Sequence, residues 1–351
     1  MEIKVKRGFP YVTRMIALLF NEGLLPNVLS VEIEPEYGYV TRITYLDGSV
    51  RMTRANDVGL NSGAAGDVVK DKAYTKYFLN LKNISTIPGS AFLSKWWADR
   101  LNTAPSAQNA PTDHRTFQHV MPYIRENVGL PVYVKPVDGS KGHNVWCCRT
   151  ESEVNSALEL FEHERVKVAV VEAAMSYPDF RLVILDGELI SAYQRLPLSV
   201  VGDGKNSISD LMREVQLGFV RDGRDTSLRL DDSRIQTRLA SLGFENDTIL
   251  PAGGLVQLHD ISNLSAGGIA VDLTSRVAER WVELAVDVSR MFGLRFCGID
   301  LACPDICIAE GDYFVIEVNA TPGLDHYGSV GVDQERIVQQ LYAKVLNLPP
   351  N

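Results

Sequence analysis

The sequence predicts an α+β protein, because it contains both hairpin signals and amphipathic helices. Two dipeptides, Asp47-Gly48 and Asp186-Gly187, lie between β-branched and apolar runs, which is the pattern of tight antiparallel hairpins. The segment 276–292 carries its apolar residues at helical spacing, and so does the segment 151–162. We therefore expect antiparallel strands and packed helices in one chain, without an internal repeat.

The first 70 residues are expected to form a small N-terminal unit. A short helix is predicted over residues 11–19, and the hairpin around Asp47-Gly48 joins strands over residues 41–45 and 50–53. Residues 70–80 are predicted to form a helix. Its apolar residues share one face and are Tyr74, Phe78 and Leu81.

Two segments lack a clear pattern. Residues 94–118 are polar and irregular, so we expect a loose insertion there. Residues 200–250 are charged and contain several glycine turns, so we expect a mobile region. The other elements have strand or helix patterns: strands over 132–135, 144–148, 168–171, 180–185 and 189–195, and a last helix over about 334–345.

Composition excludes several classes of protein. The chain has 351 residues, 45% of them hydrophobic, which is enough for two or three packed subdomains. Its net charge of −9 argues against general nucleic-acid binding, since no basic excess is present to neutralise phosphates. No apolar run approaches the roughly 18 to 20 residues of a membrane span. Five cysteines without a disulfide framework indicate a reducing cytoplasm.

Three oxygen-bearing side chains lie at the ends of two strand-like runs. Asp300 lies in one run, and Glu317 and Asn319 lie two positions apart in the next, so that they share a strand face. Two carboxylates and an amide form an all-oxygen set that suits Mg²⁺ held partly by substrate phosphates. An exposed polar strand end is the alternative interpretation.

A strand with a lysine leads into a loop of small residues. Lys135 ends the strand, and Gly139, Ser140, Lys141 and Gly142 form the loop. Backbone amides of such a loop can bind phosphate oxygens, and the lysine adds a positive charge. The order of residues is not that of a Walker loop, and a simple hairpin is the alternative.

A second candidate segment follows the strand over residues 168–171. Glu172 and Ala174 come at the strand end, and Asp179 follows seven residues after Glu172. Free backbone groups at a strand end can bind the edge of adenine, and a carboxylate shortly after can bind ribose hydroxyls. An ordinary strand-to-turn transition is the alternative.

The order of these segments resembles the ATP-grasp superfamily of carboxylate–amine ligases. The resemblance covers about residues 70–330, and it is most similar to the ATP-grasp module of cyanophycin synthetases and of bifunctional glutathione synthetases. Three runs carry this closer likeness: 193–197, 200–211 and 263–272. The resemblance implies two α+β subdomains that clamp ATP, over residues 71–171 and 172–351, after an N-terminal unit over residues 1–70.

The resemblance also implies roles for individual residues. Contacts to ATP are implied for Lys72, Lys135, Gly139, Ser140, Lys141, Gly142, Glu172, Ala174 and Asp179. Ligands to Mg²⁺, with Mn²⁺ as the alternative ion, are implied to be Asp300, Glu317 and Asn319. Roles near the transferred phosphate and the acyl phosphate are implied for Arg195, Asn263, Gly267 and Gly268. His143 and His326 are further candidates for contact with phosphate and amine, respectively.

The activity implied is ligation of a carboxylate to an amine through an acyl phosphate, with release of ADP and phosphate. Amino acids or a short peptide are the expected substrates, and a homodimer is the expected assembly. Three alternatives stay open: modification of a protein or precursor peptide, a small-molecule kinase, and an ATP-binding regulatory protein without catalysis.

Overall fold

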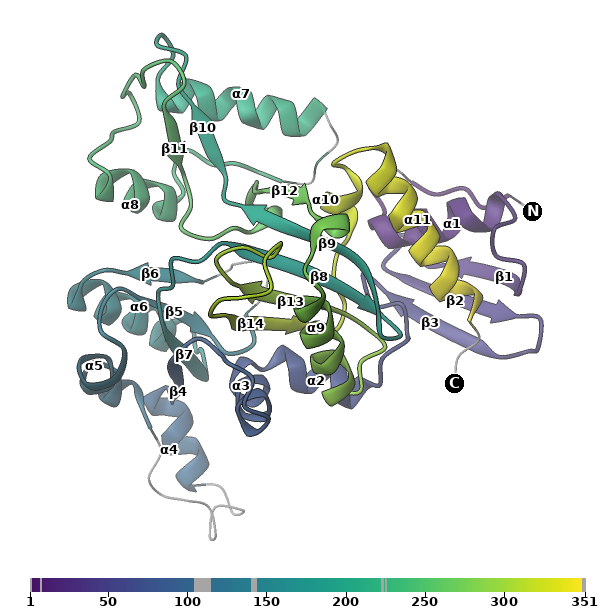
Figure 1. Ribbon diagram of the computed structural model, residues 1–351, viewed down its shortest axis with the longest axis horizontal. Helices are drawn as coiled ribbons and strands as arrows, with labels where there is room; N and C mark the ends of the chain where they lie inside the picture. Colours follow the sequence, from purple (N-terminus) through teal and green to yellow (C-terminus); the bar gives the residue numbers. More distant parts are fainter. Residues whose placement is uncertain are drawn as a thin grey trace.

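The structure is a computed structural model that describes residues 2–6, 8–103, 115–139, 144–221, 224 and 226–348. The named strands of this part of the chain form four antiparallel sheets, of three, four, five and two strands. Helices pack against these sheets (Figure 1), which confirms the predicted α+β class. None of the described helices is long and apolar enough to cross a membrane.

The N-terminal unit consists of one helix and a three-stranded meander. Its elements are α1 (Tyr11–Asn21), β1 (Val28–Ile33), β2 (Val40–Tyr45) and β3 (Val50–Arg54). The predicted helix and hairpin are confirmed, and Gly48 has a φ of +85° in the turn. The last helix, α11 (Val332–Asn347), packs on α1, so both ends of the chain share one hydrophobic core (Figure 1).

A buried arginine fixes α11 to the N-terminal sheet. Arg51 of β3 is only 2% exposed, and its guanidinium donates to the carbonyls of Val345 at 2.8 Å and Leu348 at 2.6 Å. These carbonyls belong to the last turn of α11, where backbone acceptors lack helical partners and the helix dipole favours a cation.

The predicted helix over residues 70–80 is confirmed as α3 (Lys72–Leu81), and a separate helix, α2 (Gly63–Lys70), precedes it. Asp71 separates them, because its carboxylate accepts from the amides of Ala73 and Tyr74 and so caps α3. The apolar face of α3 that the sequence identified is exposed. Tyr74, Phe78 and Leu81 are 61%, 43% and 59% exposed, whereas Thr75 and Leu79 are buried.

The four-stranded sheet has the order β4-β7-β5-β6. Its strands are β4 (Gly89–Leu93), β5 (Val132–Pro136), β6 (Trp146–Cys148) and β7 (Val168–Ala173). Helix α6 (Glu151–His163) covers it and buries Val154, Leu158 and Phe161 as the spacing predicts. A capping box between Thr150 and Glu153 starts this helix.

The expectation of an irregular segment over residues 94–118 is wrong in part. A helix, α4 (Lys95–Thr103), and short helical turns, η2 (Phe117–His119), α5 (Val120–Tyr123) and η3 (Ile124–Val128), occur there and just beyond. Helix α4 buries only Ala98, so its sequence shows no apolar periodicity. Residues 104–114 lie outside the described part of the chain.

The five-stranded sheet has the order β12-β9-β8-β13-β14. Its strands are β8 (Asp179–Leu185), β9 (Glu188–Leu196), β12 (Ile269–Asp272), β13 (Phe296–Ala302) and β14 (Phe314–Asn319). One face packs on α9 (Glu279–Met291) around the buried Trp281. Near one end, the other face packs on the N-terminal unit and on α10 (Asp325–Gly328) and α11.

The expectation of a mobile region over residues 200–250 is wrong for most of that segment. It forms a compact subdomain of a two-stranded ribbon, β10 (Ser199–Val201) with β11 (Leu255–Gln257), and two helices, α7 (Ile208–Arg221) and α8 (Ser233–Ser241). These elements enclose their own hydrophobic core. We call residues 198–258 the inserted subdomain, because they separate β9 from β12 (Figure 1).

Candidate active site

One face of the five-stranded sheet carries a row of polar and charged residues. The antiparallel registers place Asp272, Tyr193, Arg181, Asp300 and Glu317 opposite one another, one from each strand. Side chains alternate along a strand, so residues two positions away share this face. The adjacent rows therefore add Arg195, Asp179 and Asn319 to the same surface.

Asp300 accepts hydrogen bonds from two arginines. Arg181 binds both carboxylate oxygens of Asp300, at 2.6 and 2.7 Å, and Arg195 binds one of them at 2.7 Å. Asp300 is 1% exposed, so burial opposes its ionisation. The two guanidiniums outweigh that effect and lower the pKa of Asp300 below its ordinary value. Arg181 is a site residue that the sequence reasoning missed.

Asp179 is bound by the same Arg195, whose Nη2 lies 2.7 and 2.9 Å from the two carboxylate oxygens. Burial raises the pKa of Asp179, and although Arg195 opposes that effect, the nearby charge of Asp300 adds to it. Arg195 thus joins two carboxylates that the sequence predicted to bind ribose and metal.

A second ionic cluster lies on the four-stranded sheet. The carboxylate of Glu172 is 3% exposed and pairs with Lys135 at 2.5 Å and with Lys76 of α3 at 2.6 Å. Burial opposes its ionisation, but the two lysines lower the pKa of Glu172 overall. Lys76 was not predicted. It lies one helical turn after Lys72, so helical spacing could have identified it.

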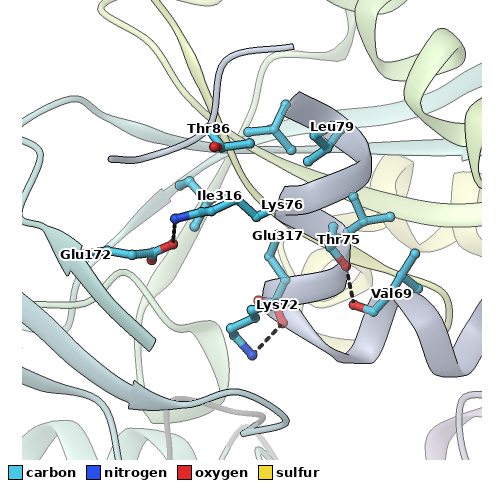
Figure 2. Close-up of a pocket in the computed structure, with 11 residues that line it drawn as sticks. Val69, Lys72, Thr75, Lys76, Leu79, Thr86, Glu172, Ile316 and Glu317 are labelled. Carbon is cyan, nitrogen blue, oxygen red and sulfur yellow. Dashed lines mark hydrogen bonds and ion pairs between the residues drawn. The ribbon is translucent and has the colours of Figure 1, made fainter. Parts of the chain in front are cut away.

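Lys72 connects the two sheets. Its ammonium donates to the carbonyl of Gly139 at 2.7 Å and lies 3.5 Å from a carboxylate oxygen of Glu317. Figure 2 shows Lys72 pointing to Glu317 and Lys76 pointing to Glu172. Lysines from one helix therefore reach carboxylates of two different sheets.

A narrow pocket lies beside these lysines. Its lining comes from α2, α3, β7, β14 and the segment before β4: Val69, Lys72, Thr75, Lys76, Leu79, Thr86, Glu172, Val315, Ile316, Glu317 and Val318 (Figure 2). It contains about 270 Å³ of space between atoms, part of it open to solvent. The ion pairs of Lys72 with Glu317 and of Lys76 with Glu172 line this space.

The predicted metal ligands lie together. Asp300 and Glu317 are directly opposite each other on β13 and β14, and Asn319 is two residues further along β14. The side-chain nitrogen of Asn319 is buried without a hydrogen-bond partner. Two carboxylates and an amide oxygen form a donor set that fits a hard cation. Among the described residues, no group of three or more His, Cys, Asp or Glu side chains could hold a metal.

The predicted glycine-rich segment, residues 263–268, forms a tight loop around η4 (Leu264–Ala266). The amides of Ala266 and Gly268 donate to the carbonyl of Asn263, and the amide of Ser265 donates to its side chain. Gly267 has a φ of +100° and its amide donates to the carbonyl of Leu264. These amides are therefore bonded within the loop rather than directed at a ligand.

Other predicted residues are less informative. The amide of Ala174 donates to the carbonyl of Pro131 at 3.0 Å. His326 lies 3.7 Å from the carboxylate of Asp325. Ser140, Lys141, Gly142 and His143 lie outside the described residues.

Comparison with known proteins identifies the fold. Residues 259–341 match the RimK-like ATP-grasp domain. A solved structure, a bifunctional glutathione synthetase from Pasteurella multocida, superposes with a TM-score of 0.58 at 19% identity, over 96% of this chain and 45% of that chain. This likeness shows that the two chains share a fold.

The sequence is also similar to the two kinds of protein named in the resemblance above. It is 32% identical over 203 residues to cyanophycin synthetase of Geminocystis herdmanii, which covers 56% of this chain and 23% of that protein. It is 31% identical over 204 residues to the bifunctional glutathione biosynthesis protein of Streptococcus thermophilus, covering 55% of this chain and 27% of that protein. The matched region thus spans about a quarter of each of these relatives.

Proposed function

We propose that this protein is an ATP-dependent ligase that joins a carboxylate to an amine through an acyl phosphate. The observation that carries the proposal is the convergence of two ionic clusters, one from each larger sheet, at the helix α3. Lys72 and Lys76 reach from that helix to Glu317 and Glu172. Sequence similarity to a cyanophycin synthetase and a glutathione biosynthesis protein supports the same class of reaction.

The charge balance of the site suits a polyphosphate. The two clusters contain five cationic side chains and four carboxylates: Lys72, Lys76, Lys135, Arg181 and Arg195 against Glu172, Asp179, Asp300 and Glu317. We propose that ATP phosphates replace the carboxylates as partners of Lys72 and Lys135. The adenine would lie along residues 172–174, the ribose near Asp179, and the Gly139–Gly142 loop over the phosphates.

We propose Mg²⁺ as the metal, with Asp300, Glu317 and Asn319 as its protein ligands. When bound, the ion would neutralise phosphate oxygens and orient them for transfer. The lowered pKa of Asp300 keeps it ionised, as a metal ligand must be. Mn²⁺ has similar ligand preferences and would be the alternative.

In the proposed reaction, the substrate carboxylate attacks the γ-phosphorus, and ADP leaves. The amine then attacks the acyl carbon, and phosphate leaves with loss of a proton from nitrogen. Arg181 and Arg195 are positioned to stabilise charge on the transferred phosphate, since both lie on the sheet face next to Asp300. Enclosure between the two sheets would keep water from the acyl phosphate.

The substrates, the assembly and the compartment are proposed from the resemblance to ATP-grasp ligases. We propose amino acids or a short peptide as substrates, a homodimer as the assembly, and the cytoplasm as the compartment. All five cysteines are free thiols in the structure, which supports a reducing compartment. The domain boundaries near residues 70 and 171 remain part of this proposal.

The test is an ADP-release screen with a panel of amino acids and dipeptides, each supplied as carboxylate and amine. We expect ADP release only when both partners are present, and a product with the mass of their sum less one water. Hydroxylamine should trap the acyl phosphate as a hydroxamate. Release of ADP with a phosphorylated product and no need for an amine would instead establish a kinase. No nucleotide binding by calorimetry would refute the proposal.

A further inference from the structure

The loop of residues 263–268, called the glycine loop below, lies directly before β12. Its residue Gly268 is followed by Ile269, which pairs with Leu196, and by Ala270, which pairs with Arg195. A Cβ on Gly268 would lie 2.6 Å from the carbonyl oxygen of Leu196, so the loop packs tightly on the end of β9. The shape of the glycine loop therefore bears directly on the strand that carries Arg195.

The inserted subdomain contacts this loop at several points. Arg224, which follows α7, donates through Nη2 to the carbonyl of Leu264 and, at 2.7 Å, to the carbonyl of Gly268. The hydroxyl of Thr226 lies 3.4 Å from the carbonyl of Ser265. One guanidinium nitrogen thus joins the start and the end of the glycine loop.

Arg224 is itself held in place. Its guanidinium carbon lies 4.6 Å from the ring centroid of Phe219 on α7, a distance typical of a cation–π contact. A Cβ on Gly267 would lie 3.3 Å from the same ring and 3.0 Å from Leu198. The Nε atom of Arg224 is buried without a hydrogen-bond partner. The loop, Phe219 and Arg224 therefore form one packed unit.

We propose that Arg224 is a positioning residue of the ligase: it holds the glycine loop in its observed shape and so fixes the β9–β12 end of the site, where Arg195 lies. This inference rests on the proposed function for its catalytic part. Among the described residues, the hydrogen bonds and ring contact of Arg224 are to carbonyl groups of the loop and to Phe219. Its effect is accordingly expected on turnover rather than on nucleotide binding.

Hydrogen exchange tests the structural part without any need for activity. The amides of Ser265, Ala266, Gly267 and Gly268 all donate within the loop, so their exchange reports its closure. We expect Arg224→Ala to speed exchange there by on the order of tenfold or more, as for loss of a charge-assisted hydrogen bond. Arg229→Ala is the matched control, because the Arg229 side chain is exposed and forms an ion pair with Asp231, away from the glycine loop. Unchanged exchange in Arg224→Ala would overturn the proposal.

Kinetics test the catalytic part. We expect Arg224→Ala to lower kcat by about tenfold to a hundredfold, as displaced catalytic groups do, while KM for ATP stays within about twofold. Arg224→Lys should retain part of the rate, and added guanidinium ion should restore part of the rate of Arg224→Ala.

A faster-exchanging loop with unchanged kcat would overturn the catalytic part. If Arg224→Ala unfolds, Arg224→Lys decides by the same two measurements. A wild-type protein without ligase activity refutes the proposed function, and the exchange experiment still decides the role of Arg224 in the loop.

Discussion

At the scale of single residues, the two guanidiniums that bind Asp300 determine the ionisation of this buried carboxylate. A buried carboxylate is costly unless it is paired and hydrogen-bonded. Arg181 and Arg195 meet that need and keep Asp300 ionised. Under the proposed function, the phosphates of ATP would bind the guanidiniums of Arg181 and Arg195. The carboxylate of Asp300 would then be available to bind a metal ion.

Glu317→Ala should abolish ADP formation while leaving the fold intact. Glu317 is a proposed metal ligand, and its ion pair with Lys72 is long, at 3.5 Å. We therefore expect a change in unfolding free energy of less than about 1 kcal/mol. The measurements are ADP release and urea denaturation, with Glu310→Ala on an exposed loop as the control. Full turnover in Glu317→Ala would refute the metal assignment.

Glu172 should make stability depend on pH in the acidic range. Its folded-state pKa lies below the ordinary 4.5, so the ionised form stabilises the fold above that pH. This contribution is lost as the pH falls from about 4.5 towards the folded-state pKa. We expect Glu172→Gln to be less stable than the wild type at pH 7, and the difference to shrink below pH 4.5. Urea denaturation at several pH values measures it, and a constant difference would contradict the assignment.

The sequence predicts residues of the site better when they form a local motif. Asp300, Glu317 and Asn319 could be grouped because two strand ends and an i, i+2 spacing identify them. Arg181 could not be paired with Asp300 from the sequence, because the two residues are 119 positions apart and the β8–β13 register brings them together. Arg181 lies two residues from Asp179 on the same strand, so strand alternation could have placed both on one face.

At the scale of elements, one asparagine joins the N-terminal segment to two strands of the site sheet. The side-chain amide of Asn61 donates to the carbonyls of Phe296 and Ala320, at 2.6 and 2.7 Å. Its oxygen accepts from the amides of Arg295 and Phe296. These bonds fix the start of β13 and the end of β14, and hence the opposition of Asp300 and Glu317.

Asn61→Ala should therefore destabilise the protein by about 2–3 kcal/mol, because it leaves backbone groups unsatisfied in a partly buried place. Asn102→Ala, on an exposed part of α4, should change stability by less than about 0.5 kcal/mol. Thermal and urea denaturation of both variants provide the comparison. Equal stability of the two variants would show that Asn61 contributes nothing beyond a surface residue.

Elements were predicted from the sequence where burial follows a regular period. Strands β8 and β9 and helices α6 and α9 bury continuous or periodic apolar faces, and all were predicted. In helix α3 the face with the apolar residues Tyr74, Phe78 and Leu81 is exposed, whereas Lys72 and Lys76 form ion pairs in the site. The inserted subdomain was missed because its small core is spread over segments rich in charge and glycine.

At the scale of the whole molecule, Asp260 joins three parts of the structure. Its carboxylate lies 2.5 Å from Arg149, which follows β6, and 3.2 Å from Arg238 on α8. The hydroxyl of Tyr133 on β5 donates to its carbonyl at 2.9 Å. The inserted subdomain is thus tied to the four-stranded sheet at Asp260 and to the glycine loop at Arg224.

Asp260→Asn should lower the free energy of unfolding by about 1–2 kcal/mol, because it removes one charge-assisted partner from two arginines. Raising NaCl from about 0.05 to about 0.5 M should weaken the wild type more than the variant, since salt screens these partly exposed pairs. Urea denaturation at both salt concentrations measures this. Asp231→Asn, in an exposed pair with Arg229, should show almost no effect. The same salt response in Asp260→Asn and the wild type would contradict the prediction.

The contact between α1 and α11 has a consequence for the order of folding during synthesis. The core around Ile16, Leu19 and Ile43 is completed by Tyr342, Val345 and Leu346, roughly 300 residues later in the chain. Arg51 likewise finds its acceptors only at residues 345 and 348. The N-terminal unit is synthesised well before α11, and its core stays incomplete on the ribosome until α11 has emerged. Contacts of such long range slow folding, so residues 11–54 are made long before they can reach their native packing.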